Sequence, residues 1–274
     1  MCAPILRTKD LQTRIEAHRR FSERDVDFFA WVVEHVPWQG GEQVLDVGCG
    51  TGVYLPYYRR YTPHMTALDL SPEMVVQVRA QWPDVDVLVA NAMHLPFPSA
   101  SFDVAFANHV LFFVPDINRA LREIHRILRP GGWFVAATNA QKALHRLHTL
   151  HAAALRSIGR RPHPLRHVRF ALENGRALVA AVFGTAEVQV MDNAFCFPTV
   201  DDAMKYYLSG EVNNVEGAPL TSAERHRVLT MMREHIAAII RQEGVFRVPK
   251  PSGVILARRE SDHIGVNATN QPHP

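Results

Sequence analysis

The feature that most constrains this chain is a short apolar run that ends in a glycine-rich turn. Residues 43–47 read Gln-Val-Leu-Asp-Val, which predicts a buried strand, and Gly-Cys-Gly-Thr-Gly follows at once. Gly48 and Gly50 remove side chains from the turn and permit unusual backbone angles, while Gly52 lets the next helix start close to the sheet. Open α/β sheets bind ligands at this place, beyond the carboxyl ends of their strands.

Strands and helices alternate around this turn. Further strands are expected at 64–70, 85–89, 102–107 and in the segment WFVAATN that follows Gly132, with helices from Pro72 to about residue 81 and over 116–128. This alternation predicts a Rossmann-like, doubly wound and mostly parallel seven-stranded sheet with helices on both faces. Later elements are expected as helix 168–183 and strands 185–190 and 253–259.

The remaining segments are expected to surround this core. Residues 1–40 are predicted to hold two helices, 9–20 and 22–36, the second capped by Ser22. The Rossmann-like core would span 41–140, and two mostly helical stretches would form a cap over the carboxyl edge of the sheet. The expected boundaries are 141–165 and 198–248 for the cap, 166–197 and 249–260 for the rest of the core, and 261–274 for a flexible tail.

Composition narrows the class of protein further. The chain of 274 residues has a formal net charge of +3, so it does not favour a nucleic-acid partner. No apolar run is long enough to span a membrane, and three scattered cysteines suit a reducing compartment, so a cytoplasmic protein is expected. No His/Cys spacing is typical of a metal site; His145, His148 and His151 share a helix face that more simply faces solvent.

The spacing of acidic residues and glycines separates two kinds of nucleotide site. Asp69 ends the second strand, where a carboxylate can accept hydrogen bonds from both hydroxyls of an adenosine ribose. A dinucleotide fingerprint would place Gly or Ala where this chain has Val53. The pattern from Asp46 to Gly52 is instead Asp-x-Gly-x-Gly-x-Gly, which suits a ligand that carries positive charge and no phosphate.

This pattern resembles that of the class I methyltransferases that use S-adenosylmethionine (SAM). The segments ALDLSPEM, LPFPSASFDVAFANHVLFFVPD and LREIHRILRPGGWFVAAT extend the resemblance over about residues 40–140, most closely to the ubiquinone/menaquinone-biosynthesis (type 11) family. The resemblance implies that Asp46 and the glycine turn meet the methionine part of SAM and that Asp69 binds its ribose. It also implies further cofactor contacts from Leu70, Met74, Asn91, Ala92, Met93 and Asn108.

Asn91 stands where the family often has an aspartate that accepts from the adenine amine. Its side-chain oxygen could still accept, without the charge. Candidate residues for the acceptor are less specific. His109 follows the fourth strand and could act as a general base, or simply cap the next turn. Several aromatics could line an acceptor pocket or serve as core, namely Phe112, Phe113, Tyr206 and Tyr207.

The resemblance implies in-line transfer of a methyl group from SAM to an O, N or C nucleophile of a small molecule enclosed by the cap. Arg20 and Phe21 precede the second helix and could close over SAM; Glu211, Asn213 and Asn214 could touch the acceptor or face solvent.

Three alternatives remain at this point: an RNA methyltransferase, a non-catalytic SAM-binding module and a nicotinamide-dependent dehydrogenase. The chain lacks the Asn/Asp-Pro-Pro-aromatic motif of enzymes that methylate base amino groups.

Overall fold

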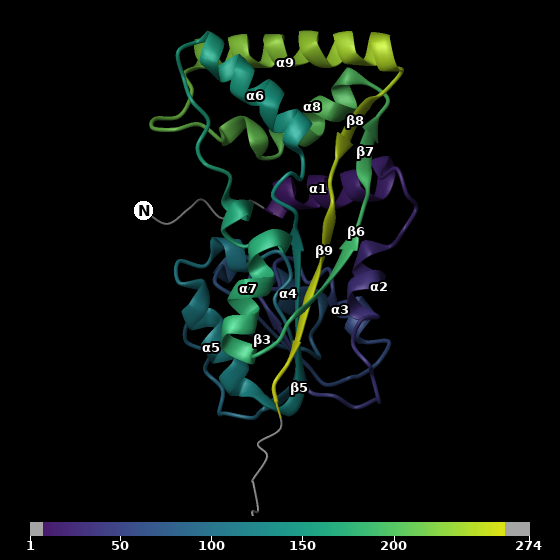
Figure 1. The fold of residues 1–274 in the computed structure, drawn as a ribbon, viewed down its shortest axis with the longest axis vertical. Coiled ribbons are helices and arrows are strands. Elements are labelled where there is room, and N and C mark those ends of the chain that lie inside the picture. Colours follow the sequence, from purple (N-terminus) through teal and green to yellow (C-terminus); the bar gives the residue numbers. More distant parts are fainter. Residues whose placement is uncertain (1–7, 261–274) are drawn as a thin grey trace, which may run out of the picture.

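A computed structural model describes residues 8–260, so the tail expected to be flexible lies outside the described residues. The molecule has a large α/β core at one end and a smaller, mainly helical cap at the other, with helix α1 (Thr8–Phe21) between them (Figure 1). Within the described part of the chain, no helix is both long and apolar enough to cross a membrane.

The core is built on one seven-stranded sheet, in the order β3-β2-β1-β4-β5-β9-β6. The first five strands of this order are parallel, and β9 pairs antiparallel with both β5 and β6. The strands are β1 (Val44–Val47), β2 (Met65–Asp69), β3 (Asp86–Val89), β4 (Phe102–Phe106), β5 (Leu128–Asn139), β6 (Glu187–Met191) and β9 (Ser252–Arg258). The predicted Rossmann-like, mostly parallel sheet is confirmed.

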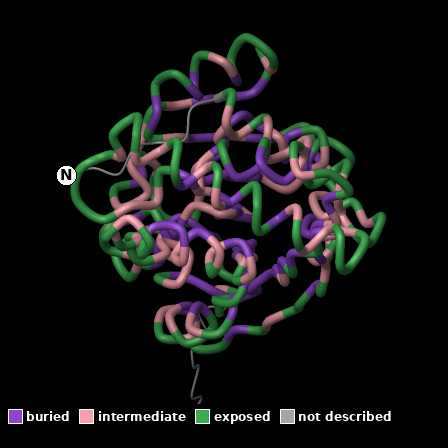
Figure 2. Tube along the Cα trace, turned by 90° about the horizontal axis from the view of Figure 1, so that it is seen from above, coloured by how far each residue is buried: buried purple, intermediate pink, exposed green. Residues whose placement is uncertain are grey.

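Helices cover both faces of this sheet, so its central strands are buried on both sides. One face packs against α5 (Ile117–Ile127) and α7 (Leu172–Phe183), and the other against α2 (Phe28–Val33), α3 (Leu55–Tyr58) and α4 (Pro72–Gln81). Successive residues of β1 feed the two apolar cores in turn, because strand side chains alternate between faces. Figure 2 shows the buried residues running through the interior and the exposed ones on the outer turns.

The cap has a hydrophobic core of its own. It contains α6 (His145–Ser157), α8 (Val200–Leu208) and α9 (Ser222–Glu243), together with a two-stranded ribbon of β7 (Ala194–Phe197) and β8 (Phe246–Pro249). Short 3₁₀ turns η1 (Leu111–Phe113), η2 (Arg166–Arg169) and η3 (Glu211–Asn213) complete the fold. In Figure 1 the cap lies beyond the ends of the parallel strands, with α9 farthest from the core.

Two expectations for these regions were wrong. Ser22 does not cap a helix: its hydroxyl donates to the carbonyl of His18, and α2 begins later with Asp27 as its N-cap, accepting from the amides of Phe29 (3.1 Å) and Ala30 (3.2 Å). The boundary between core and cap was also wrong. Strand β7, which was assigned to the core, pairs with β8 inside the cap, and neither strand of this ribbon was predicted.

Candidate active site

The glycine turn is held in a shape that only glycine adopts easily. Gly48, Gly50 and Gly52 all have positive φ angles, +75°, +54° and +75°. A Cβ on Gly48 would fall 2.3 Å from Cγ2 of Val110, so a larger residue would also collide with the segment after β4. The amide of Gly48 donates to the carbonyl of Leu68 over 2.7 Å, which ties the turn to the end of β2.

Asp69 lies at that end of β2 and braces the same turn. Its Oδ2 accepts from the amide of Gly50 over 2.9 Å, and its Oδ1 accepts from the amide of Ser71 over 2.8 Å. Both carboxylate oxygens keep further lone pairs, and the residue is only half-buried. Asp69 can therefore accept ribose hydroxyls while holding the turn in place.

Asp46, two residues before Gly48, is a buried carboxylate with an unsatisfied oxygen. It is 2% exposed, and its Oδ2 has no hydrogen-bond partner among the described residues. Burial, together with the charge of Asp69, raises the pKa of Asp46 to about 7, although a hydrogen bond from Tyr58 opposes the shift. The hydroxyl of the neighbouring Tyr54 is buried without a partner as well. Buried polar atoms without a partner in the protein indicate a binding site for a polar ligand, and a cationic group suits the carboxylate best.

The segment after β3 only partly matches its expected role. The side-chain oxygen of Asn91 accepts from the amide of Met93 over 2.9 Å, so this oxygen already closes its own turn. Leu70 is 56% exposed beside Asp69, free to cover a ring, whereas Met74 is buried in the interior. The contacts of Leu70 and Met74 with adenine stay predictions, and of the two side chains only that of Leu70 is exposed.

Asn108 and His109 follow β4 at the same edge of the sheet. The side chain of Asn108 is engaged in the fold: its oxygen accepts from the amide of Ala137 (3.0 Å) and its NH₂ donates to Tyr58 (3.1 Å). His109 has a φ of +54°, an uncommon left-handed conformation for a residue other than glycine. Burial lowers the pKa of His109 to about 4, so its imidazole is neutral near pH 7.

Helix α1 lies over this region, which the sequence did not reveal. Leu11 comes within 3.5 Å of a Cβ position on Gly50, so α1 packs directly above the glycine turn. Arg20 and Phe21 lie at the other end of α1: Arg20 is exposed beside Glu16, and the ring of Phe21 packs against Phe197 in the cap. The part of α1 around Leu11, rather than its last residues, covers the turn.

A partly buried ionic cluster joins the cap to α1. Arg14 donates to Oε1 of Glu211 over 2.8 Å, and Nε2 of His148 lies 3.0 Å from Oε2 of the same residue. Burial opposes ionisation of Glu211, but the hydrogen bond from His148 and the charge of Arg14 outweigh it and lower the pKa of Glu211. The expectation that Glu211 faces solvent by default was therefore wrong.

The three cap histidines do not converge on one point. His151 pairs with Tyr207 (2.6 Å) and with the carbonyl of Asn214 (2.9 Å) rather than with Glu211, while His145 is exposed. Among residues 8–260, no group of three or more His, Cys, Asp or Glu side chains could hold a metal ion.

The candidate aromatics do not form a single wall. The pair Tyr206 and Tyr207 is buried in the core of the cap. Phe112 packs in the core of the main sheet, and Phe113 is 42% exposed. The aromatic side chains that the sequence grouped together thus serve two separate cores.

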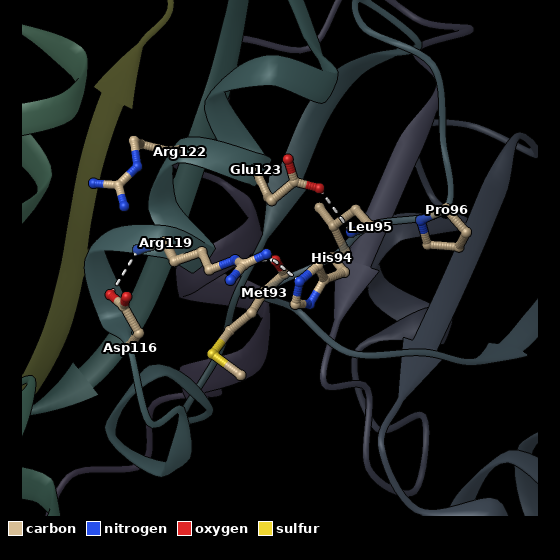
Figure 3. A pocket seen from close by; sticks show the side chains of 8 residues that line it. All are labelled: Met93, His94, Leu95, Pro96, Asp116, Arg119, Arg122 and Glu123. Carbon is tan, nitrogen blue, oxygen red and sulfur yellow. Dashed lines mark hydrogen bonds between the residues drawn. The ribbon is translucent and has the colours of Figure 1, made fainter.

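A surface hollow of about 630 Å³ lies beside the segment after β3, lined in part by Met93 and Glu123 (Figure 3). Its polar groups largely satisfy one another. The carboxylate of Glu123 accepts from the amide of Leu95 over 2.8 Å, and Arg119 donates to the carbonyl of Met93 over 3.1 Å. The unsatisfied Asp46 is not among its lining residues, so this hollow is distinct from the glycine turn.

Comparison with known proteins shows which family the chain belongs to. A methyltransferase domain model matches residues 45–136. A malonyl-[acyl-carrier protein] O-methyltransferase of Erwinia billingiae is 38% identical over 107 residues, which cover 39% of this chain and 43% of that protein. The same enzyme of Enterobacter lignolyticus is 30% identical over 176 residues, covering 64% of this chain and 67% of that protein. The chain belongs to the class I SAM-dependent methyltransferases, in their type 11 family.

Except for the match to the Enterobacter lignolyticus enzyme, the chain spans less than half the length of these relatives. A 27-O-demethylrifamycin SV methyltransferase of Amycolatopsis mediterranei is 40% identical over 106 residues, 35% of this chain and 38% of that protein. Among solved structures, the YcgJ protein of Bacillus subtilis aligns with a TM-score of 0.61 and 18% identity, covering 85% of this chain and 98% of that one. At that identity the likeness concerns the fold.

Proposed function

We propose that this protein transfers the methyl group of SAM to a small-molecule acceptor that enters between helix α1 and the carboxyl edge of the sheet. The observation that carries the proposal is the unsatisfied oxygen of Asp46, buried beside a glycine turn that Asp69 braces. SAM carries an ammonium group that suits this carboxylate and ribose hydroxyls that suit Asp69. The residues present therefore fit the cofactor that the family uses.

Each part of the turn has a distinct task in this proposal. Asp46 binds the ammonium group, and the backbone of the turn approaches the cofactor closely because Gly48 and Gly50 have no side chain. Asp69 accepts from the ribose, and Leu70 covers the adenine ring. The sulfonium of the cofactor supplies an activated methyl group, so the chain mainly aligns the acceptor and excludes water.

His109 is proposed to face the acceptor. Its neutral imidazole can accept or donate a hydrogen bond, but a pKa of about 4 makes it a weak base.

The names of the relatives describe two kinds of acceptor. One is a malonyl group on an acyl-carrier protein, and the other is a rifamycin precursor. Those names support a small acceptor group for this chain, free or attached to a carrier.

Unpaired Cys49 and Cys196 support a cytoplasmic location.

Calorimetry tests the proposal. The protein should bind SAM and its demethylated product, and NAD should give no heat of binding under the same conditions. Binding of NAD in place of SAM would refute the methyltransferase assignment. Binding of SAM without methylation of any compound in a broad acceptor panel would favour a non-catalytic SAM-binding module.

A further inference from the structure

Lys250 is a buried lysine without a counter-ion. It lies between β8 and β9 and is 8% exposed. Its Nζ donates to Nδ1 of His18 over 3.1 Å and to Oγ of Ser22 over 2.9 Å, and the ring centroid of Phe195 lies 4.6 Å away. Within residues 8–260, no carboxylate lies within ion-pair distance of this ammonium. Burying a charge in this way is costly unless a partner compensates it.

The surroundings of Lys250 are positive rather than acidic. Burial lowers the pKa of His18, and nearby Lys250, His109 and Arg14 lower it further. The charge of Arg14 is already compensated by Glu211, at 2.8 Å. No carboxylate is among the groups that shift the pKa of His18. The positive charge of Lys250 is therefore not balanced by a negative charge next to His18.

His18 is an exposed residue in contact with the buried ammonium of Lys250, and the space over its ring is named the crevice here. Burial against neighbouring protein atoms is the main cause of its lowered pKa. Since its Nδ1 accepts from Lys250, the neutral ring carries its proton on Nε2. The crevice therefore presents an ammonium with one N–H left over and an imidazole N–H beside it.

His18, one of these two donors, lies on the same face of α1 as Leu11, the residue above the glycine turn. Leu11 and His18 are seven residues apart on α1, which places them about 10 Å apart along one side of the helix. His109, which affects the pKa of His18, precedes Val110, the residue that packs against Gly48. His18, which contacts Lys250, and Leu11, which lies above the cofactor turn, thus share one side of α1.

We propose that Lys250, held by His18 and Ser22, binds a carboxylate of the methyl acceptor. This inference rests on the proposed function and names the acceptor class for the same crevice. One ammonium balances the single charge of a carboxylate, whereas a phosphate carries more charge and is typically bound by arginines or several donors. The acceptor is then a carboxylic acid, and its acid group is oriented by the chain itself.

The test uses the full-length protein saturated with the demethylated product of SAM. A panel of aliphatic and aromatic monocarboxylic acids is titrated by calorimetry alongside the carboxamide of each acid, with inorganic phosphate as a further probe. At least one acid should bind tenfold or more tightly than its amide and than phosphate. Lys250→Met should weaken that acid at least tenfold, while Lys142→Met, at an exposed lysine outside the crevice, should not.

Three results would overturn the proposal: no acid binding better than its amide, phosphate binding as well as the acids, or undiminished binding to Lys250→Met. If Lys250→Met does not fold, a crystal of the wild-type protein with a brominated acid of the panel decides the question. Bound acid with its carboxylate on Nζ of Lys250 supports the site, and bound acid elsewhere refutes it. Failure to bind the demethylated product at all would instead contradict the proposed function.

Discussion

The two sides of the crevice carry opposite buried charges. On the sheet side, burial raises the pKa of Asp46 to about 7, next to the charge of Asp69. On the side of α1 and the cap, burial lowers the pKa of Lys250 to about 8. Among residues 8–260, neither group has an oppositely charged side chain as its partner. This difference underlies the proposal that a cationic methyl donor and an anionic acceptor bind at separate places.

The largest effect is expected on the donor side. Asp69→Ala removes the acceptor for two ribose hydroxyls and for the amide of Gly50, and each charge-assisted hydrogen bond contributes about 1.5–3 kcal/mol. Affinity for SAM should fall by about 100-fold or more, measured by calorimetry. Asp84→Ala, at an exposed carboxylate paired with Arg59, is the matched control and should leave the affinity unchanged. Equal affinity in both variants would remove Asp69 from the ribose site.

The shape of the turn should matter nearly as much. Gly48→Ala adds a Cβ at a positive φ and forces it against Val110, so unfolding free energy should fall by about 3 kcal/mol, with loss of SAM binding. Gly217 also has a positive φ, +79°, but nothing lies within 4 Å of its Cβ position. Gly217→Ala should cost about 1 kcal/mol. Equal losses in chemical denaturation would show that contact with Val110 is unimportant.

The charge of Asp46 predicts a pH dependence. An ammonium group binds the ionised carboxylate, so affinity for the demethylated product should rise as the pH increases through the pKa of about 7. The gain from pH 6 to pH 8 is about tenfold, the change in the ionised fraction. Titrations of Asp46→Asn should show a nearly flat profile. A wild-type profile equally flat over this range would contradict the contact.

The smallest effect is expected from the acceptor side, and with the opposite sign. Lys250→Met replaces an uncompensated buried charge with an apolar chain of similar length, so the free energy of unfolding should increase by about 1 kcal/mol at pH 7. The pKa of Lys250 is lowered from its ordinary 10.5, so the folded protein loses this proton first. The advantage of the variant should therefore shrink from pH 8 toward 10.5. A variant less stable than wild type at pH 7 would indicate a purely structural lysine.

The sequence was most informative where contacts are local. The turn from Asp46 to Gly52 follows its own strand directly, and Asp69 ends the very next strand, so spacing alone placed them at one edge. The helices and strands of the core carry periodic apolar patterns, which is why the sheet could be predicted. What the pattern could not show was the unsatisfied oxygen of Asp46, because burial depends on packing from the whole sheet.

The cap was less predictable because its contacts join distant segments. Phe197 of β7 pairs with Phe246 of β8, and neither short strand is marked by a turn that links the two. Lys250 and His18 are 232 residues apart, and no motif connects them. Glu211 lies in a segment rich in polar residues, which suggested exposure, yet Arg14 from α1 reaches it. The pairs of Lys250 with His18 and of Glu211 with Arg14 arise only once α1 packs against the cap.

The most direct test of the account is a crystal structure of the protein with the demethylated product of SAM bound. The ammonium group should lie within hydrogen-bond distance of Asp46 and the ribose hydroxyls on Asp69, which leaves the space toward Lys250 open for the acceptor. A product bound with its ammonium group at Lys250 or His18, or away from Asp46 and Asp69 altogether, would contradict the division of the crevice into an acidic donor side and a basic acceptor side.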